Sequence, residues 1–142
     1  MNNSLITDLI YIGTKHCCVL PLDRLIPTLL CEMEVPKVHF GKFLVGRTLI
    51  GGINSDGLFG TTTLFEDING DVEEITFYYF RRRIMSEKAN WIPKSTIFIV
   101  SEPFLKYGLQ GNVFVRVDSP SAVEFICETD QQRLKAVGAM KW

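Results

Sequence analysis

The amino-acid sequence predicts a single, mostly-β domain of five or six strands. From residue 41 onward, short runs rich in β-branched and aromatic residues alternate with clusters of Gly, Asn, Asp and Pro, which is the pattern of strands and turns. The length of 142 residues falls within the usual size of one domain. Apolar residues make up 46% of the chain and charged residues 22%, which is an ordinary globular composition and argues against disorder.

The first predicted strand covers residues 43–53, and the turn residues 54–57 follow it. The next two strands, residues 60–66 and 71–80, flank the pair Asn69-Gly70. This pair accepts the positive φ angles of a tight turn, so it predicts a β-hairpin. Because side chains alternate along a strand, the second arm places Ile75, Phe77 and Tyr79 on one face and Thr76, Tyr78 and Phe80 on the other.

Residues 81–93 are polar and predict an irregular connection with one helical turn. Residues 96–100 predict a strand that Glu102-Pro103 ends, because proline cannot donate to a strand ladder. Further strands are predicted over residues 112–117 and 123–127.

This order of elements matches a five-stranded Greek-key barrel of the OB type, with a short helix between strands three and four. We therefore predict an OB-like barrel of five or six strands over residues 41–127. The preceding residues 1–40 form an irregular or helical flank packed on the barrel, and residues 128–142 form a tail or short helix.

Three blocks between residues 27 and 126 resemble a region that precedes the tetratricopeptide repeats (TPR) and SET domain of certain fungal proteins. They are residues 39–44 (HFGKFL), residues 65–72 (FEDINGDV), and residues 101–106 (SEPFLK) together with 115–121 (VRVDSPS). The resemblance implies an accessory β-domain. It does not imply methyltransferase activity, because nothing in this chain resembles the SET catalytic core or a helical repeat array. The Arg-rich segment 81–90 departs from the family pattern.

The sequence offers no set of residues for catalysis or metal binding. His16 lies beside Cys17 in sequence only, and we expect His39 to bond the edge of the barrel. The four cysteines form no C-x-x-C pair, and no phosphate-binding glycine motif is present. We therefore expect no enzyme activity, no metal and no cofactor.

The net charge of −1 lacks the general basic excess of a dedicated nucleic-acid binder, although it leaves room for a local basic patch. The first residues carry no basic signal-peptide region, and prolines and charges interrupt the apolar stretch 17–31. We expect an intracellular protein, cytoplasmic or nuclear, without a membrane partner.

One cluster points to a ligand: the aromatic run 77–80 is followed at once by three arginines. Rings that stack bases and cations that follow phosphates are what single-stranded nucleic acid requires. In an OB barrel the binding face spans strands two and three with the loops after strands one and four, here residues 51–58 and 106–112. The candidate binding residues are Tyr78, Phe80, Arg81, Arg83, Lys106, Tyr107 and Arg116.

An alternative interpretation places the rings in the core and leaves the arginines solvated or paired with Glu73, Glu74 or Glu87. In it, Arg116 bonds Asp118 and Lys106 pairs with Glu102. This arrangement is the commoner one, so the sequence favours a non-catalytic protein-interaction module or scaffold with a protein partner. Single-stranded nucleic-acid binding is the second hypothesis, and a small enzyme is the third.

Overall fold

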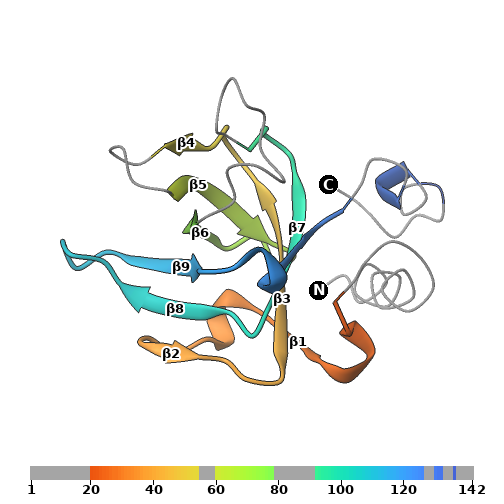
Figure 1. Cartoon of the computed structure of the whole chain (residues 1–142), viewed down its shortest axis with the longest axis horizontal. Coiled ribbons are helices and arrows are strands. Elements are labelled where there is room, and N and C mark those ends of the chain that lie inside the picture. The colour runs from red at the N-terminus through yellow and green to blue at the C-terminus, as the bar shows by residue number, and fades with distance from the viewer. Residues whose placement is uncertain (1–19, 55–59, 79–91, 127–129, 133–135, 137–142) are drawn as a thin grey trace.

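The computed structural model describes residues 20–54, 60–78, 92–126, 130–132 and 136. In this part of the chain, ten strands belong to one sheet (Figure 1). The strands are β1 (Ile26–Thr28), β2 (Lys37–Val38), β3 (Lys42–Thr48), β4 (Ile53–Asn54), β5 (Gly60–Asp67), β6 (Val72–Tyr78), β7 (Ile97–Ser101), β8 (Phe104–Tyr107), β9 (Val113–Val117) and β10 (Val123–Phe125). Short 3-10 helices are η1 (Leu22–Arg24), η2 (Leu30–Glu32) and η3 (Pro120–Ala122).

The longer strands form a barrel with the OB order. β3 pairs antiparallel with β5, β5 pairs antiparallel with β6, and β6 pairs parallel with β9. β9 then pairs antiparallel with β8, while β7 pairs antiparallel with β3. Only two residues separate β7 from β8, so these strands act as one bent strand that closes the barrel. The third barrel strand, β6, thus lies beside the fifth, β9, as in the Greek-key OB barrel. The predicted mostly-β, OB-type fold is confirmed.

Glu102-Pro103 ends β7 as predicted, but the sequence prediction missed the strand that follows. The chain turns at these two residues and pairs again from Phe104. Ser101 still pairs with β3, whereas Phe104 already pairs with β9. The missing N–H of Pro103 is tolerated because it falls between the two ladders, and Glu102 takes a φ of 49° to make the turn.

Residues of the segment 34–42 form hydrogen bonds with both residues of the bend, Glu102 and Pro103. The Glu102 N–H donates to the Lys42 carbonyl at 2.6 Å, and the Glu102 carboxylate accepts from the Gly41 N–H at 3.0 Å. The Pro103 carbonyl accepts from the backbone N–H of His39 at 3.0 Å. Two of the sequence blocks that carry the fungal resemblance, 39–44 and 101–106, therefore contact each other.

The imidazole of His39 is buried and bonded through both nitrogens. Its Nδ1 lies 2.9 Å from the Pro103 carbonyl oxygen, and its Nε2 accepts from the Glu34 N–H at 2.9 Å. Since an N–H faces Nε2, the proton is on Nδ1, which donates to the carbonyl. His39 thus bonds the barrel edge, as expected.

Short strands extend the barrel at its margins. β1 pairs parallel with β3, and β2 pairs antiparallel with β8, so both come from the segment predicted as a flank. Figure 1 shows β6, β9, β8 and β2 following one another along one side of the molecule.

The helix predicted between strands three and four lies in residues 79–91, outside the described residues. Residues 130–132 are helical.

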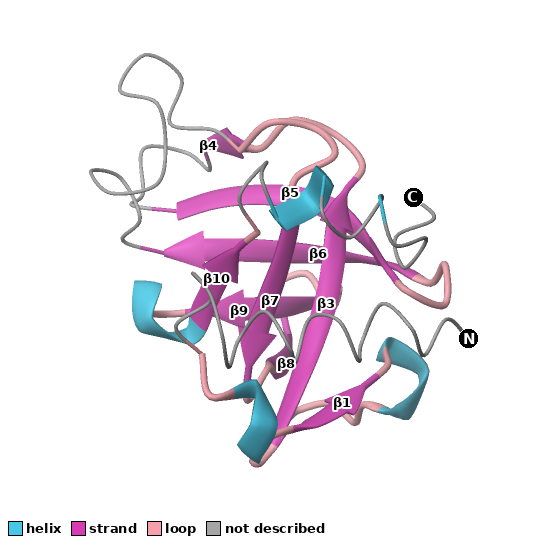
Figure 2. Cartoon of the chain, turned by 90° about the vertical axis from the view of Figure 1, so that its right-hand side faces the viewer, coloured by secondary structure: helices cyan, strands magenta, loops and turns pink. Residues whose placement is uncertain are grey.

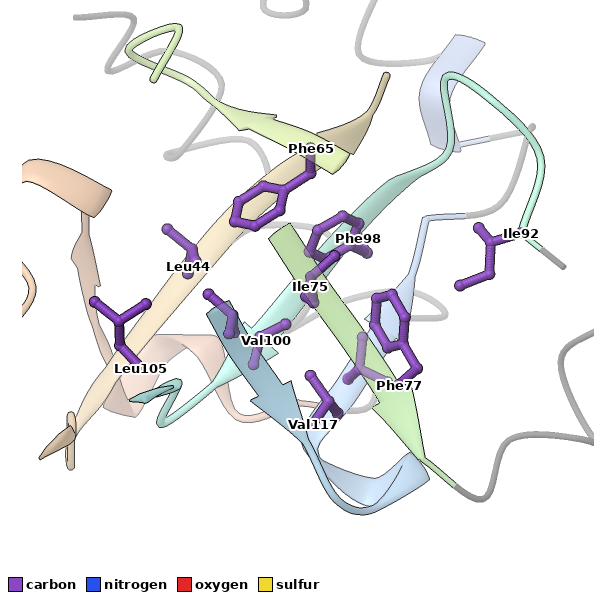
Figure 3. Close-up of a cluster of buried hydrophobic side chains, with 11 residues drawn as sticks. Leu44, Phe65, Ile75, Phe77, Ile92, Phe98, Val100, Leu105 and Val117 are labelled. Atoms are coloured by element: carbon purple, nitrogen blue, oxygen red, sulfur yellow. The ribbon is translucent and has the colours of Figure 1, made fainter. Parts of the chain in front are cut away.

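The core fills the barrel interior and uses the alternation predicted for β6. Ile75 and Phe77 are fully buried, and Phe77 and Phe65 each meet the ring of Phe98 edge-on, with centroids 5.6 and 5.4 Å apart (Figure 3). A Cβ atom on Gly46 would come within 2.5 Å of the Phe98 ring, so only glycine fits there. Figure 2 shows β5 and β6 crossing the direction of β3 and β7 around this core.

The β5–β6 hairpin is fixed by a buried carboxylate. Gly70 has a φ of 87°, as the predicted turn requires. Asp67 is fully buried and accepts from the N–H groups of Asn69 and Asp71 at 2.9 and 3.0 Å. Its second oxygen accepts from the Leu30 N–H at 2.9 Å. The same side chain therefore shapes the turn and ties η2 to the sheet.

Replacing Asp67 with alanine is expected to lower the free energy of unfolding by about 3 kcal/mol, because three backbone donors lose an ionised acceptor. Asp71→Ala, at an exposed position of the same turn, serves as the control and should cost less than about 0.5 kcal/mol. Urea unfolding followed by circular dichroism measures both values. Equal losses in the two variants would contradict the anchoring role of Asp67.

His39→Ala is expected to lower the free energy of unfolding by about 2–3 kcal/mol, since it removes two hydrogen bonds and leaves a cavity at the bend. The matched control is Phe40→Ala, because the Phe40 side chain is 77% exposed and should contribute little to stability. Thermal or urea unfolding tests this. An unchanged midpoint for His39→Ala would show that the bend does not need the imidazole.

Candidate functional site

A groove of about 560 Å³ lies on the outer face of the barrel, over β6, β8, β9 and the loop between β8 and β9. This volume is within the range of small-molecule binding clefts. The loop after the fourth barrel strand was predicted to border the binding face, and it does line the groove through Gly108, Leu109 and Gln110. The residues predicted for the other loop are described only in part.

Strand alternation and register bring the lining side chains together. Inward-facing Ile75 and Phe77 leave Glu74, Thr76 and Tyr78 on the outer face of β6. On the neighbouring strand, Phe114 lies opposite Glu74, and Arg116 lies opposite Thr76. β8 continues the pattern, with Lys106 opposite Phe114 and Phe104 opposite Arg116. Two rows of side chains therefore cross three strands: Lys106–Phe114–Glu74 (the first row) and Phe104–Arg116–Thr76 (the second row).

Cations lie against aromatic rings on this face. The guanidinium carbon of Arg116 is 4.5 Å from the centroid of the Tyr78 ring, and the Arg116 Nε donates to Asp118 Oδ1 at 2.5 Å. The Lys106 ammonium lies 5.9 and 6.0 Å from the ring centroids of Phe104 and Phe114. Such contacts are worth about 0.5–1 kcal/mol each at exposed sites. Together they hold both cations over the groove.

The floor of the groove carries polar groups, and its rim carries exposed apolar side chains. Thr62 and Thr76 share a hydrogen bond between their hydroxyl oxygens at 2.9 Å. At the rim, Tyr107 is 51% exposed and Leu109 is fully exposed at the tip of the loop. The groove thus joins hydroxyls and charges on its floor to apolar side chains at its open edge.

Four of the seven predicted binding residues line the groove together: Tyr78, Lys106, Tyr107 and Arg116. The other three, Phe80, Arg81 and Arg83, lie outside the described residues. The Arg116–Asp118 pair of the alternative interpretation is present, yet Arg116 still borders the groove. The Glu102 carboxylate bonds the Gly41 N–H instead of pairing with Lys106 as that interpretation supposed.

Sequence reasoning missed Glu74, Asn112, Phe114 and Thr62. Three of these four residues could have been found from strand alternation, because every second residue of a strand lies on the same face. Thr76 and Glu74 share the face of Tyr78, and Phe114 and Asn112 share the face of Arg116. Thr62 depends on the register of the hairpin, in which it pairs with Thr76. That register follows from the turn at Asn69-Gly70.

The described residues hold no group of three or more His, Cys, Asp or Glu side chains that could bind a metal ion. Among them there is also no helix with the length and apolar character needed to cross a membrane.

Comparison with protein-family models finds no match, and no curated protein is similar to the chain. The resemblance to the fungal TPR/SET proteins therefore stays a prediction.

Among solved structures, the chain is similar to fission yeast Pot1 crystallised with ssDNA, at a TM-score of 0.50 and 10% identity over 84% of this chain. This chain spans about half, 49%, of the length of that one. The Schizosaccharomyces pombe Pot1pC domain bound to ssDNA matches at a TM-score of 0.48 and 12% identity, over 78% of this chain and 95% of that one. At 10% identity, the first likeness shows the fold alone, in agreement with the OB order of strands.

Proposed function

We propose that the groove binds single-stranded nucleic acid, which was the second of the functions considered from the sequence. The observation that carries the proposal is the Tyr78–Arg116 contact on the open face of an OB barrel, with Lys106 on the neighbouring strand. Base stacking on aromatic side chains, together with cations along the backbone, is the common mode of single-strand binding. In other OB folds the face of strands two and three, with its adjoining loops, binds oligonucleotides and oligosaccharides, and this groove includes Thr62 of the second strand, three residues of the third strand, β6, and the loop after the fourth.

The groove offers two cations for contact with the phosphates of a short strand. Lys106 and Arg116 lie on one face, where Arg116 is also paired with Asp118 and Glu74 lines the same groove, in a chain whose net charge is −1. Attraction to phosphate is therefore local rather than spread over the whole surface. Two phosphate contacts correspond to a slope of about −1.4 in the dependence of log K on log salt for a single strand.

The favoured alternative from the sequence, a protein-interaction scaffold, has less support in this groove. The centre of a protein–protein interface is depleted of Lys and Glu, whereas Arg and Tyr are enriched there. Here Lys106 and Glu74 both line the groove. Rings interspersed with cations fit bases and phosphates better than they fit an apolar protein surface.

Tyr78→Ala is expected to weaken the binding of a fluorescein-labelled, mixed-sequence 12-mer of single-stranded DNA by roughly 5- to 150-fold, the equivalent of one lost stacked base. Fluorescence anisotropy at low salt measures the dissociation constant. The matched control is Phe40→Ala, which removes another exposed ring, in the turn between β2 and β3. The control should change affinity less than about twofold. If both variants bind like the original protein, Tyr78 does not stack a base.

Lys106→Gln is expected to reduce the magnitude of the salt-dependence slope by about 0.7, because one phosphate contact is lost. The control, Lys94→Gln, removes the same charge at an exposed position before β7 and should leave the slope unchanged. Anisotropy titrations at four salt concentrations provide the slopes. The same reduction in both variants would indicate a general charge effect and contradict a contact at Lys106.

A further inference from the structure

Glu74 is an unexpected residue in a groove for a polyanion. Its carboxylate lines the same groove as the two cations, and the residue is half-buried. An anion there repels phosphates and lowers affinity for every sequence alike. A carboxylate at this position is therefore best explained by a contact with a hydrogen-bond donor of the ligand.

The surroundings of Glu74 orient the carboxylate and leave it able to accept further bonds. Asn112 donates from its amide nitrogen to Glu74 Oε2 at 3.4 Å. Among the described residues, the carboxylate oxygens have no other hydrogen-bond or ion-pair partner. An ionised carboxylate only accepts, and its two oxygens can receive a bidentate pair of donors.

The first row sets a donor and an acceptor on either side of Phe114, which is only 8% exposed and forms part of the groove floor. Lys106, which only donates, lies at one end, and Glu74, which only accepts, lies at the other. The ring of Phe114 lies between them in the register of β8, β9 and β6. Neighbouring strands are about 4.8 Å apart, so the two charged residues are separated by roughly 10 Å along the row. A flat purine fits across such a row.

The four bases differ in how they match this arrangement. Guanine carries two neighbouring donors, N1–H and N2–H, next to the acceptors O6 and N7. Adenine and cytosine present an acceptor beside the amino group on their pairing edge, and the lone N3–H of thymine lies between two acceptors. A carboxylate repels those acceptors. Guanine alone can give Glu74 two hydrogen bonds and still accept from a cation such as Lys106.

We infer that Glu74 makes the groove selective for guanine in a single strand. The inference rests on the proposed function, since it names the base that the same groove prefers. Glu74 and Tyr78 are about 13 Å apart along β6, so the guanine position is separate from the ring that Arg116 covers. Tyr78 then stacks a neighbouring base of any kind, while the first row identifies one base.

The test measures binding of 9-mers of thymidylate that carry guanine, inosine, adenine or cytosine at the central position, and of the unsubstituted 9-mer. The guanine oligonucleotide is expected to bind about 5- to 150-fold more tightly than the adenine, cytosine and thymine ones, the range for one bidentate base contact. Inosine keeps N1–H but lacks the 2-amino group, so it should fall between them.

Glu74→Gln keeps the shape of the side chain but replaces one acceptor with a donor. The preference for guanine should then fall to about twofold or less, while affinity for the unsubstituted 9-mer stays equal or rises because an anion is gone. Glu73→Gln is the control: it removes the same charge one residue away, on the opposite face of β6. The Glu73 carboxylate accepts from the Glu74 N–H at 2.9 Å, a bond that the glutamine oxygen can keep, so this variant should retain the preference.

The outcomes separate the two claims. Binding of all five oligonucleotides with similar affinity, or an undiminished guanine preference in Glu74→Gln, would overturn the inference and leave the proposed function standing. Loss of the preference in Glu73→Gln as well would also overturn it, since a general charge effect would then explain the result. No binding to any of the oligonucleotides at low salt would overturn the proposed function together with the inference.

Discussion

The bend at Glu102–Pro103 is the constraint on which the rest of the structure depends. It lets one segment pair with β3 before the bend and with β9 after it, so that a sheet with two free edges becomes a barrel. Barrel closure removes exposed strand edges, which are otherwise sites of unwanted pairing. The bend is held by side-chain and backbone hydrogen bonds from His39, Gly41 and Lys42 rather than by the strand ladders themselves.

The same bend builds the groove. β8 exists only because the chain resumes pairing at Phe104, and β8 supplies Lys106 and Tyr107 to the groove. The parallel pairing of β6 with β9 then aligns Glu74 with Phe114 and Thr76 with Arg116. The chemistry of the face therefore follows from a register that the barrel fixes. Buried residues such as Gly46, which packs against the Phe98 ring, do not line the groove and affect it only by keeping the strands in this register.

Local features of the structure could be predicted from the sequence, and non-local ones could not. Asn69-Gly70 marked the hairpin, and alternation along β6 separated buried Phe77 from groove-lining Tyr78. Glu102-Pro103 correctly predicted the end of β7, but the missing donor of Pro103 says nothing about whether the chain pairs with a different neighbour afterwards, so β8 was missed. Glu74 was considered only as a possible partner of the arginines, because its place beside Phe114 and Lys106 depends on the pairing of β6 with β9 and of β9 with β8. The pairing of β1 and β2 with the barrel is likewise a long-range contact without a local signal.

We propose that the groove over β6, β8 and β9 binds a single strand of nucleic acid. The decisive experiment is a titration of the ¹⁵N-labelled chain with a guanine-containing 9-mer, followed by ¹H–¹⁵N correlation spectra. The largest shifts are predicted at Thr76, Tyr78, Lys106, Asn112 and Arg116, while η1 (Leu22–Arg24) should change little. Shifts confined to other parts of the chain, or spectra that do not change at all, would contradict the account.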